Sequence, residues 1–142
     1  MAYWFRSVGD KEGWANRAPL WPNLNPINHT ADLWFPDYSS VQRAVHPGDH
    51  FIVYAPGGPG KIVGIAHLLT ALKPRSPQWR WDKKYTQQGS VRLLRYVALD
   101  PHLGMAPAGY PILQGSHNPL NVQTYHKLAR QFIAHADQVG LP

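Results

Sequence analysis

Cysteine is absent from the 142 residues of this sequence. Its absence excludes disulfide bridges, thiolate ligands for zinc and cysteine nucleophiles, and it favours a reducing compartment. Acidic residues are also few, because Glu12 is the only glutamate and the seven aspartates are scattered along the chain. A close pair of carboxylates for general acid and base chemistry therefore has few candidates, and we expect a protein that is not an enzyme.

Long hydrophobic runs are missing as well. The most apolar stretch, Ile62 to Leu72, is interrupted by His67 and Thr70 and is far shorter than the roughly 20 residues that span a bilayer. The opening "MAYWFRSVGD" lacks the charged start and continuous apolar run of a signal peptide. We expect a soluble, cytoplasmic protein without a membrane partner.

Basic residues, in contrast, are in excess. Lys and Arg total 14 against 8 acidic residues, which gives a net charge of +6. Such a balance suits a polyanionic partner, although many small basic domains bind none. Hydrophobic residues make up 44% and charged residues 15%, which is typical of a folded chain, and the length fits one domain spanning residues 1–142.

Hydrophobic alternation predicts strands at residues 2–7, 50–55, 61–73 and 90–100. Tyr3 and Phe5 face one side of the first strand and Trp4 the other, so this strand should lie inside a sheet. The second and third strands should form a hairpin through "PGGPG". The mixed pattern of the last strand fits a curved sheet or small barrel.

Helical periodicity is clearest at the end of the chain. An apolar stripe from Asn121 to Val139 predicts a helix that covers the sheet and buries Val122, Leu128, Phe132 and Ile133. A short helix is expected at residues 39–45. Four prolines break any period between residues 9 and 36, so we expect a long ordered connection there. The whole is an α+β domain on a mostly antiparallel, barrel-like sheet.

Three segments resemble functional motifs but lack the residues or geometry that the corresponding chemistry needs. "GGPGKIVG" is not a phosphate-binding loop, because Lys61 is followed by Ile62 and a helix N-terminus does not follow. His46 and His50 are separated by Pro47 and Gly48, which prevents the helical turn that would direct both imidazoles at one metal ion. The neighbours in "QGSHN", Ser116 and His117, point apart in a strand and lack a nucleophile elbow. We expect no metal and no cofactor.

One loop concentrates aromatic and basic residues, "SPQWRWDKKYTQQGS" at 76–90. If "WRW" is extended, Trp79 and Trp81 share one face, where they could accept a flat base. Arg80, Lys83 and Lys84 at the rim could then meet phosphate. An aromatic lid that closes the core is the equally weighted alternative.

Several segments together resemble the EVE domain of the PUA-like group, a relative of the YTH domain. They are "AYWFRS", "GDHFIVYA" followed by "KIVGIAHLLTAL", "SVRLLRYVALD", and "ILQGSHNPLNVQTYHKL" before a helix. The resemblance covers the first strand and most of the chain from Val45 onward. Between residues 9 and 36 the sequence departs from the family, and "LWPNLNPIN" stands where the family has a tryptophan before an arginine-asparagine run.

The resemblance implies a PUA-like fold and a reader of a modified base, such as a C5-modified cytosine or a methylated adenine. The resemblance implies that the partner is a nucleic acid, DNA rather than RNA, whose modified base is flipped into an aromatic pocket. The residues expected to contact the base are Trp21, Asn23, Asn25, Trp34, Tyr54, Trp79, Trp81, Tyr85 and Ser116. Those expected to contact phosphate are Arg80, Lys83, Lys84 and His117.

Two other functions stay open. A hydrolase of the PUA-like group that acts on a modified nucleoside would need a lysine, a threonine or an acid in the pocket, and the candidates are Lys61, Thr70 and Asp82. A protein-interaction module could use the aromatic loop to dock a partner.

Overall fold

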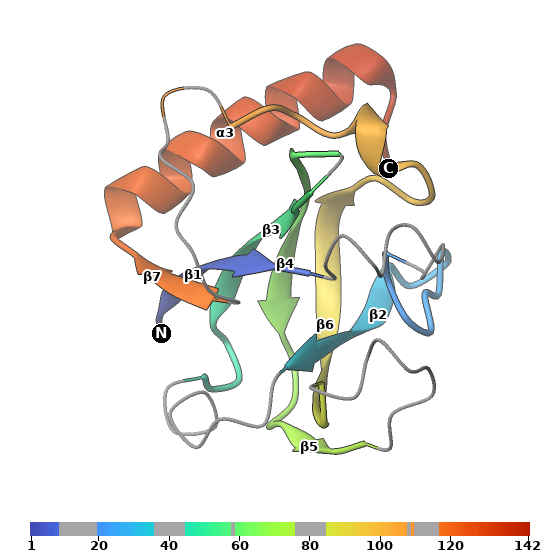
Figure 1. Ribbon diagram of the computed structural model, residues 1–142, viewed down its shortest axis with the longest axis vertical. Helices are drawn as coiled ribbons and strands as arrows, with labels where there is room; N and C mark the ends of the chain where they lie inside the picture. The colour runs from blue at the N-terminus through green and yellow to red at the C-terminus, as the bar shows by residue number, and fades with distance from the viewer. Residues whose placement is uncertain (9–19, 36–44, 58, 76–84, 108, 110–116) are drawn as a thin grey trace.

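The computed structural model describes residues 1–8, 20–35, 45–57, 59–75, 85–107, 109 and 117–142. Within them the chain forms a seven-stranded sheet, a short 3-10 helix and a long C-terminal helix (Figure 1). The elements, in chain order, are β1 (Tyr3–Ser7), β2 (Thr30–Phe35), β3 (His50–Ala55), β4 (Lys61–Leu68), β5 (Lys73–Pro74), β6 (Gln87–Tyr96), η2 (Pro101–Leu103), β7 (His117–Leu120) and α3 (Val122–Val139).

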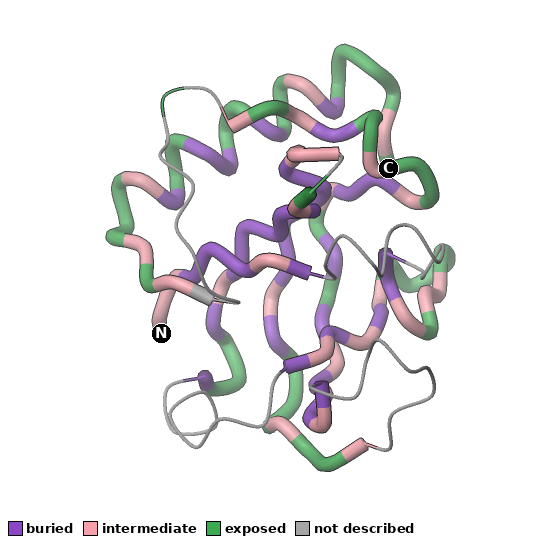
Figure 2. The backbone as a smooth tube through the Cα atoms, in the orientation of Figure 1, coloured by how far each residue is buried: buried purple, intermediate pink, exposed green. Residues whose placement is uncertain are grey.

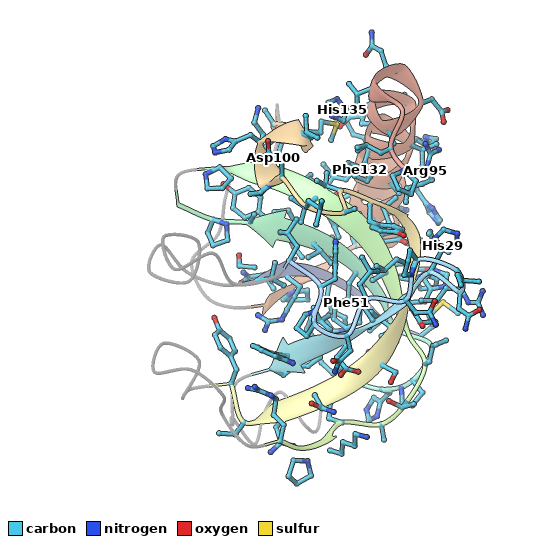
Figure 3. The ribbon with its side chains drawn as sticks, turned by 90° about the vertical axis from the view of Figure 1, so that its right-hand side faces the viewer. His29, Phe51, Arg95, Asp100, Phe132 and His135 are labelled. Atoms are coloured by element: carbon cyan, nitrogen blue, oxygen red, sulfur yellow. The ribbon has the colours of Figure 1, made fainter. Side chains whose placement is uncertain are left out.

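The strands are ordered β2-β6-β4-β3-β1-β7, with the short β5 paired to β6. Every pairing is antiparallel except that of β1 with β3. The interior position predicted for the first strand is confirmed, because β1 lies between β3 and β7. The sheet is strongly curved but remains open, with β2 and β7 at its edges, so the expected barrel is not closed (Figure 3).

Each face of the sheet carries its own hydrophobic core, and the strands are accordingly the most buried part of the backbone (Figure 2). The inner face of the curve packs Trp4, Phe35, Phe51 and Val91 together. The outer face packs against α3. Alternate residues of one strand supply the two cores, as in β1, where Trp4 belongs to the inner core and Phe5 to the outer one.

Helix α3 begins directly after Asn121, which caps it. The Asn121 side chain accepts a hydrogen bond of 2.8 Å from the Thr124 amide, and Gly140 ends the helix in the left-handed conformation at φ 75°. Phe132 is fully buried between the helix and the sheet (Figure 3). The prediction that Val122 and Ile133 are buried is wrong, since they are 39% and 38% exposed. The apolar stripe is wider than the strip that the sheet covers.

Three strands were missed, and proline lies in or beside each of them. The strand expected at 61–73 ends at Leu68, and the short β5 (Lys73–Pro74) follows it as a separate strand. Strand β2 lies inside the expected connection, just after Pro26 and before Pro36. Strand β7 contains Pro119 and is an edge strand, where a missing amide donor is tolerated. Most of the helix expected at 39–45 falls outside the described residues. The helices described include none with the length and apolar character needed to cross a membrane.

Candidate nucleic-acid interface

A cluster of aromatic and arginine side chains lies where the curved sheet stays open, at the carboxyl ends of β1 and β2. We call this cluster the open end and define it by Arg6, Trp34, Arg75, Tyr85 and Gln87. Arg6 holds its two sides together, because its guanidinium donates hydrogen bonds to the carbonyl oxygens of Ser7, at 2.6 Å, and Trp34. A side chain thus joins β1 to β2 where no strand ladder does.

Arg6 is a buried cation. Only 1% of its surface is exposed, and its guanidinium carbon lies 4.9 Å from the ring centroid of Phe35 and 5.8 Å from that of Tyr85. Burial lowers the pKa of Arg6 to about 10, and the neighbouring Tyr85 partly opposes this shift. Arg6 therefore remains charged at neutral pH between two aromatic faces, which partly compensate for the water it has lost.

Trp34 and Arg75 form a second stacked pair nearer the solvent. Trp34 is half-buried on β2, and the guanidinium carbon of Arg75 lies 3.6 Å from its ring centroid. The same guanidinium donates a hydrogen bond of 2.5 Å to the carbonyl oxygen of Tyr85. The two contacts hold the guanidinium over the face of the indole, which can therefore accept a planar cationic group.

The aromatic loop identified from the sequence leaves and re-enters the structure at this cluster. The Arg75 amide donates a hydrogen bond of 2.8 Å to the carbonyl oxygen of Thr86, so both ends of the loop are fixed together. Trp79, Arg80, Trp81, Lys83 and Lys84 fall between these ends and lie outside the described residues. Trp79 is four residues from Arg75, and Trp81 is four residues from Tyr85.

A cavity of about 380 Å³ adjoins the open end. Its lining includes Pro74 and Gln87, which pair in the sheet, and Val45 and His46 across from them. This volume is within the range of small-ligand sites, roughly 300–1,000 Å³. The Gln87 amide, which is 8% exposed, brings both a donor and an acceptor to the wall.

Three predicted base contacts lie at the other end of β2. Trp21 is 3% exposed and donates its indole N–H to the carbonyl oxygen of Val97 at 2.6 Å, so it belongs to the inner core. Asn25 Oδ1 accepts the amides of the turn that precedes Thr30. Asn23 donates to Asp32 at 2.6 Å. A base held at Trp34 would not reach Trp21 or Asn25.

Of the remaining predicted contacts, the structure describes the side chain of Tyr54 alone. Tyr54 is 7% exposed and packs on Phe5 at 5.4 Å in the outer core. Ser116 lies outside the described residues, and His117 is described only through its backbone pairing with Arg6. Of the predicted base contacts that are described, the structure brings together Trp34 and Tyr85.

The residues that a hydrolase would need do not meet in the described structure. Lys61 begins β4, whereas Thr70 follows its end and accepts a hydrogen bond of 3.0 Å from the Ser90 amide. Asp82 falls outside the described residues. Within the part of the chain that is described, no three metal-ligating side chains gather.

Sequence reasoning missed Arg6, Arg75 and Gln87. Arg6 carried a usable signal, because an arginine inside an aromatic interior strand must find partners for its charge. Arg75 and Gln87 carried none, since their positions depend on the pairing of β5 with β6.

Comparison with solved structures identifies the fold of this chain. No protein-family model matches the sequence, and no curated protein matches it. The YTH domain of Mmi1, solved in complex with RNA, aligns with a TM-score of 0.59 at 10% identity over 99% of this chain and 82% of the other. Human THYN1, in complex with DNA containing 5-methylcytosine, aligns with a TM-score of 0.50 at 12% identity over 92% and 97%. A hypothetical protein from Leishmania major reaches 0.54 at 15% identity over 97% and 96%. These likenesses confirm the predicted α+β, PUA-like fold.

Proposed function

We propose that this protein binds nucleic acid and holds one modified base at the open end of its sheet, without catalysing a reaction. The observation that carries the proposal is the stack of Arg75 on Trp34 at 3.6 Å. A flat, electron-poor group already occupies the half-buried indole, and nucleic-acid bases stack both on tryptophan and on the plane of an arginine guanidinium.

The cost of extruding a base and the gain from stacking it are of similar size. Extruding a base from a duplex costs a few kcal/mol. Stacking on an aromatic side chain returns roughly 1–3 kcal/mol for each base. Trp34 supplies one such surface, with Arg75 layered on it, and Trp79 and Trp81 are the proposed partners on the other side of the base. Two surfaces together can offset the cost of extrusion.

Recognition of the modification needs groups that read the base edge. Gln87 pairs with Phe35 and therefore faces the inner side of the sheet, whereas Trp34 faces the outer side. We propose that the base projects past the end of the sheet, where Gln87 and the neighbouring cavity provide a buried amide and an enclosed volume. A site that pairs with the base edge rejects ligands that leave its polar groups unpaired. Arg80, Lys83 and Lys84, in the loop that both Arg75 and Tyr85 anchor, are the proposed phosphate contacts.

The structural neighbours support the choice of ligand. THYN1 was solved with DNA containing 5-methylcytosine, and the Mmi1 YTH domain was solved with RNA. A C5-modified cytosine or a methylated adenine is therefore the first ligand to test. We propose DNA rather than RNA, and matched strands of the two chemistries test this preference.

The experiment is a binding screen with pairs of oligonucleotides that differ only in one modified base. The native protein should bind at least one modified strand about tenfold more tightly than its unmodified twin, which corresponds to about 1.4 kcal/mol. Equal affinities across all pairs would contradict the proposal.

Two variants separate stacking from charge in that screen. Arg75→Lys keeps the positive charge but loses the planar group that covers Trp34, so the preference for the modified strand should shrink. Trp34→Phe keeps an aromatic surface and should preserve most of it. If Arg75→Lys behaves like the native protein, the guanidinium plane has no part in base capture.

A further inference from the structure

A row of imidazole and guanidinium groups crosses the outer face of the sheet, away from the open end. Strand register places Tyr3 opposite His50, His50 opposite His67, and His67 opposite Arg92. We call His50, His67 and Arg92 the histidine ladder. Since directly opposed residues on neighbouring strands have their Cβ atoms about 4.5–5.5 Å apart, three cation-forming side chains stand side by side.

The contacts within the row are close. The rings of His50 and His67 meet edge to face with centroids 3.9 Å apart, and His50 stacks on Tyr3 at 5.1 Å. The Nε2 atom of His50 touches the sulfur of Met1 at 2.7 Å, while its Nδ1 atom is buried without a hydrogen bond. His67 is half-buried and Arg92 is exposed, so these two present the row to solvent.

The described carboxylates do not neutralise the ladder. Asp49, next to His50, is buried and already accepts hydrogen bonds from the Ala2 amide, the Trp4 indole and the His46 amide. Asp137 pairs with Arg95 at 2.6 Å. Asp32 accepts from Asn23, and Asp100 caps η2.

Burial and neighbouring basic groups lower the pKa values of both histidines. Burial lowers the pKa of His50, and His67, His126 and the amino group of Met1 lower it further against the opposing effect of Asp49. Burial lowers the pKa of His67, and Arg92 adds to the shift. Tyr125, which also packs on His50, stays uncharged because burial and Tyr3 raise its pKa to about 12. An anion on this row would relieve the repulsion and favour the charged imidazoles.

We propose that the histidine ladder is a phosphate-binding site, in which Arg92 and protonated His67 hold a backbone phosphate of a nucleic acid with His50 behind them. Arg92 supplies a permanent charge and a planar fork of donors suited to phosphate oxygens. His67 adds a second charge-assisted donor as the pH falls. Phosphate binding at this row strengthens in mild acid.

The ladder continues the surface that carries Trp34. Arg92 pairs with Thr30, and Trp34 pairs with Gln88, so these side chains share the outer face, four residues apart along both strands. At about 3.3 Å per residue the separation is about 13 Å. At the rise of 3.4 Å per nucleotide of one strand, that is about four nucleotides. One bound strand can therefore reach both sites.

The site itself is tested without any base. The pKa values of the individual histidines are measured by NMR in the native protein, with and without inorganic phosphate. Phosphate should raise the pKa of His67 and, to a smaller extent, that of His50. The NMR signals of His135, which lies by η2, should not respond to phosphate and serve as the control. If the ladder histidines titrate identically in both buffers, the proposal is overturned.

The assignment to a nucleic-acid backbone is tested with an unmodified oligonucleotide at pH 7.5 and pH 5.5. The native protein should bind more tightly at pH 5.5, and Arg92→Gln should weaken binding about tenfold at that pH. Lys61→Gln is the matched control, because it removes the same charge six residues along β4 from His67. Equal losses in the two variants would overturn the backbone assignment.

The ladder proposal depends on the proposed function only for its choice of nucleic acid as partner, and the two can fail separately. If the native protein shows no preference for a modified base but phosphate still shifts the pKa values of the ladder histidines, the proposal for the open end fails. If the native protein prefers a modified base but phosphate leaves the pKa values of the ladder histidines unchanged, the proposal for the ladder fails.

Discussion

The open end and the histidine ladder both gather basic side chains, but they hold them in different ways. At the open end, Arg6 is buried between Phe35 and Tyr85, and Arg75 lies over the ring of Trp34. These charges are permanent at neutral pH and are covered by aromatic faces. At the ladder, two imidazoles with lowered pKa values stand beside one exposed arginine. The first arrangement suits a flat base, and the second suits an anion that arrives with its own charge.

The comparison also separates specificity from affinity. Contacts with base faces and edges distinguish one base from another, whereas phosphate contacts position the strand without reading it. We therefore expect changes at the open end to alter the preference between strands. Changes at the ladder should alter the affinity for all strands alike.

The largest expected effect concerns the core that supports both regions. Phe132→Ala removes a fully buried ring between α3 and the sheet and should lower the free energy of unfolding by about 3–5 kcal/mol, measured by chemical denaturation. Ile133→Ala, the exposed neighbour, is the control and should cost less than about 1 kcal/mol. If Phe132→Ala loses little free energy of unfolding, α3 does not pack against the core as described, and the shared support of the two sites is wrong.

Loss of a stacking ring comes next. Trp81→Ala should cost roughly 1–3 kcal/mol of affinity for the preferred modified strand, because one face of the captured base loses its partner. The unmodified strand should lose much less, and the melting temperature should hardly change. A collapse in stability with equal losses for every ligand would instead identify Trp81 as part of a lid on the core.

Salt dependence sharpens the role of the loop lysines. Replacing Lys83 and Lys84 by Gln should flatten the dependence of log affinity on log salt by about 0.9 for each phosphate of duplex DNA that a lysine no longer neutralises. The preference for the modified base should be unchanged. Binding by the native protein that ignores salt would exclude phosphate contacts at either region.

The smallest effect is a pH dependence of stability that belongs to the ladder. The folded protein holds the pKa of His67 below the usual value of about 6.5, so the unfolded chain binds protons more readily. The stability conferred by the neutral imidazole is present above pH 6.5 and is lost as the pH falls below it. Denaturation at pH 7.5 and 5.5 should show a smaller acid loss in His67→Gln than in the native protein. If both proteins lose the same free energy of unfolding between pH 7.5 and pH 5.5, His67 does not cause the pH dependence.

The fold was predictable wherever the pattern was local. Alternation in "HFIVYA" and the apolar stripe from Asn121 to Val139 depend on near neighbours, and both predictions are confirmed as β3 and α3. Strand β2 was not predictable, because it pairs only at an edge and its flanking prolines resemble a loop. Ile133 lies on the apolar stripe but is exposed, because the sheet covers only a part of that stripe.

The sites depend on register, which no local pattern reveals. Trp34 and Tyr85 could be nominated as aromatic residues, but their contact with Arg6 and Arg75 arises from how β1, β2 and β5 end. The histidine ladder is equally hidden, because His50, His67 and Arg92 are 17 and 25 residues apart and meet only through strand pairing. A bulge between Ile65 and Ala66 shifts the register that brings His67 opposite Arg92.

The central claim is that base recognition belongs to the open end. The most direct test is the ratio of affinities for a modified strand and its unmodified twin, measured for Trp34→Ala and Arg92→Gln alongside their melting temperatures. We predict that Trp34→Ala brings the ratio close to one through a loss of roughly 1–3 kcal/mol on the modified strand alone. Arg92→Gln should weaken both strands and leave the ratio at its native value. A native ratio in Trp34→Ala, with the protein folded, would contradict the account.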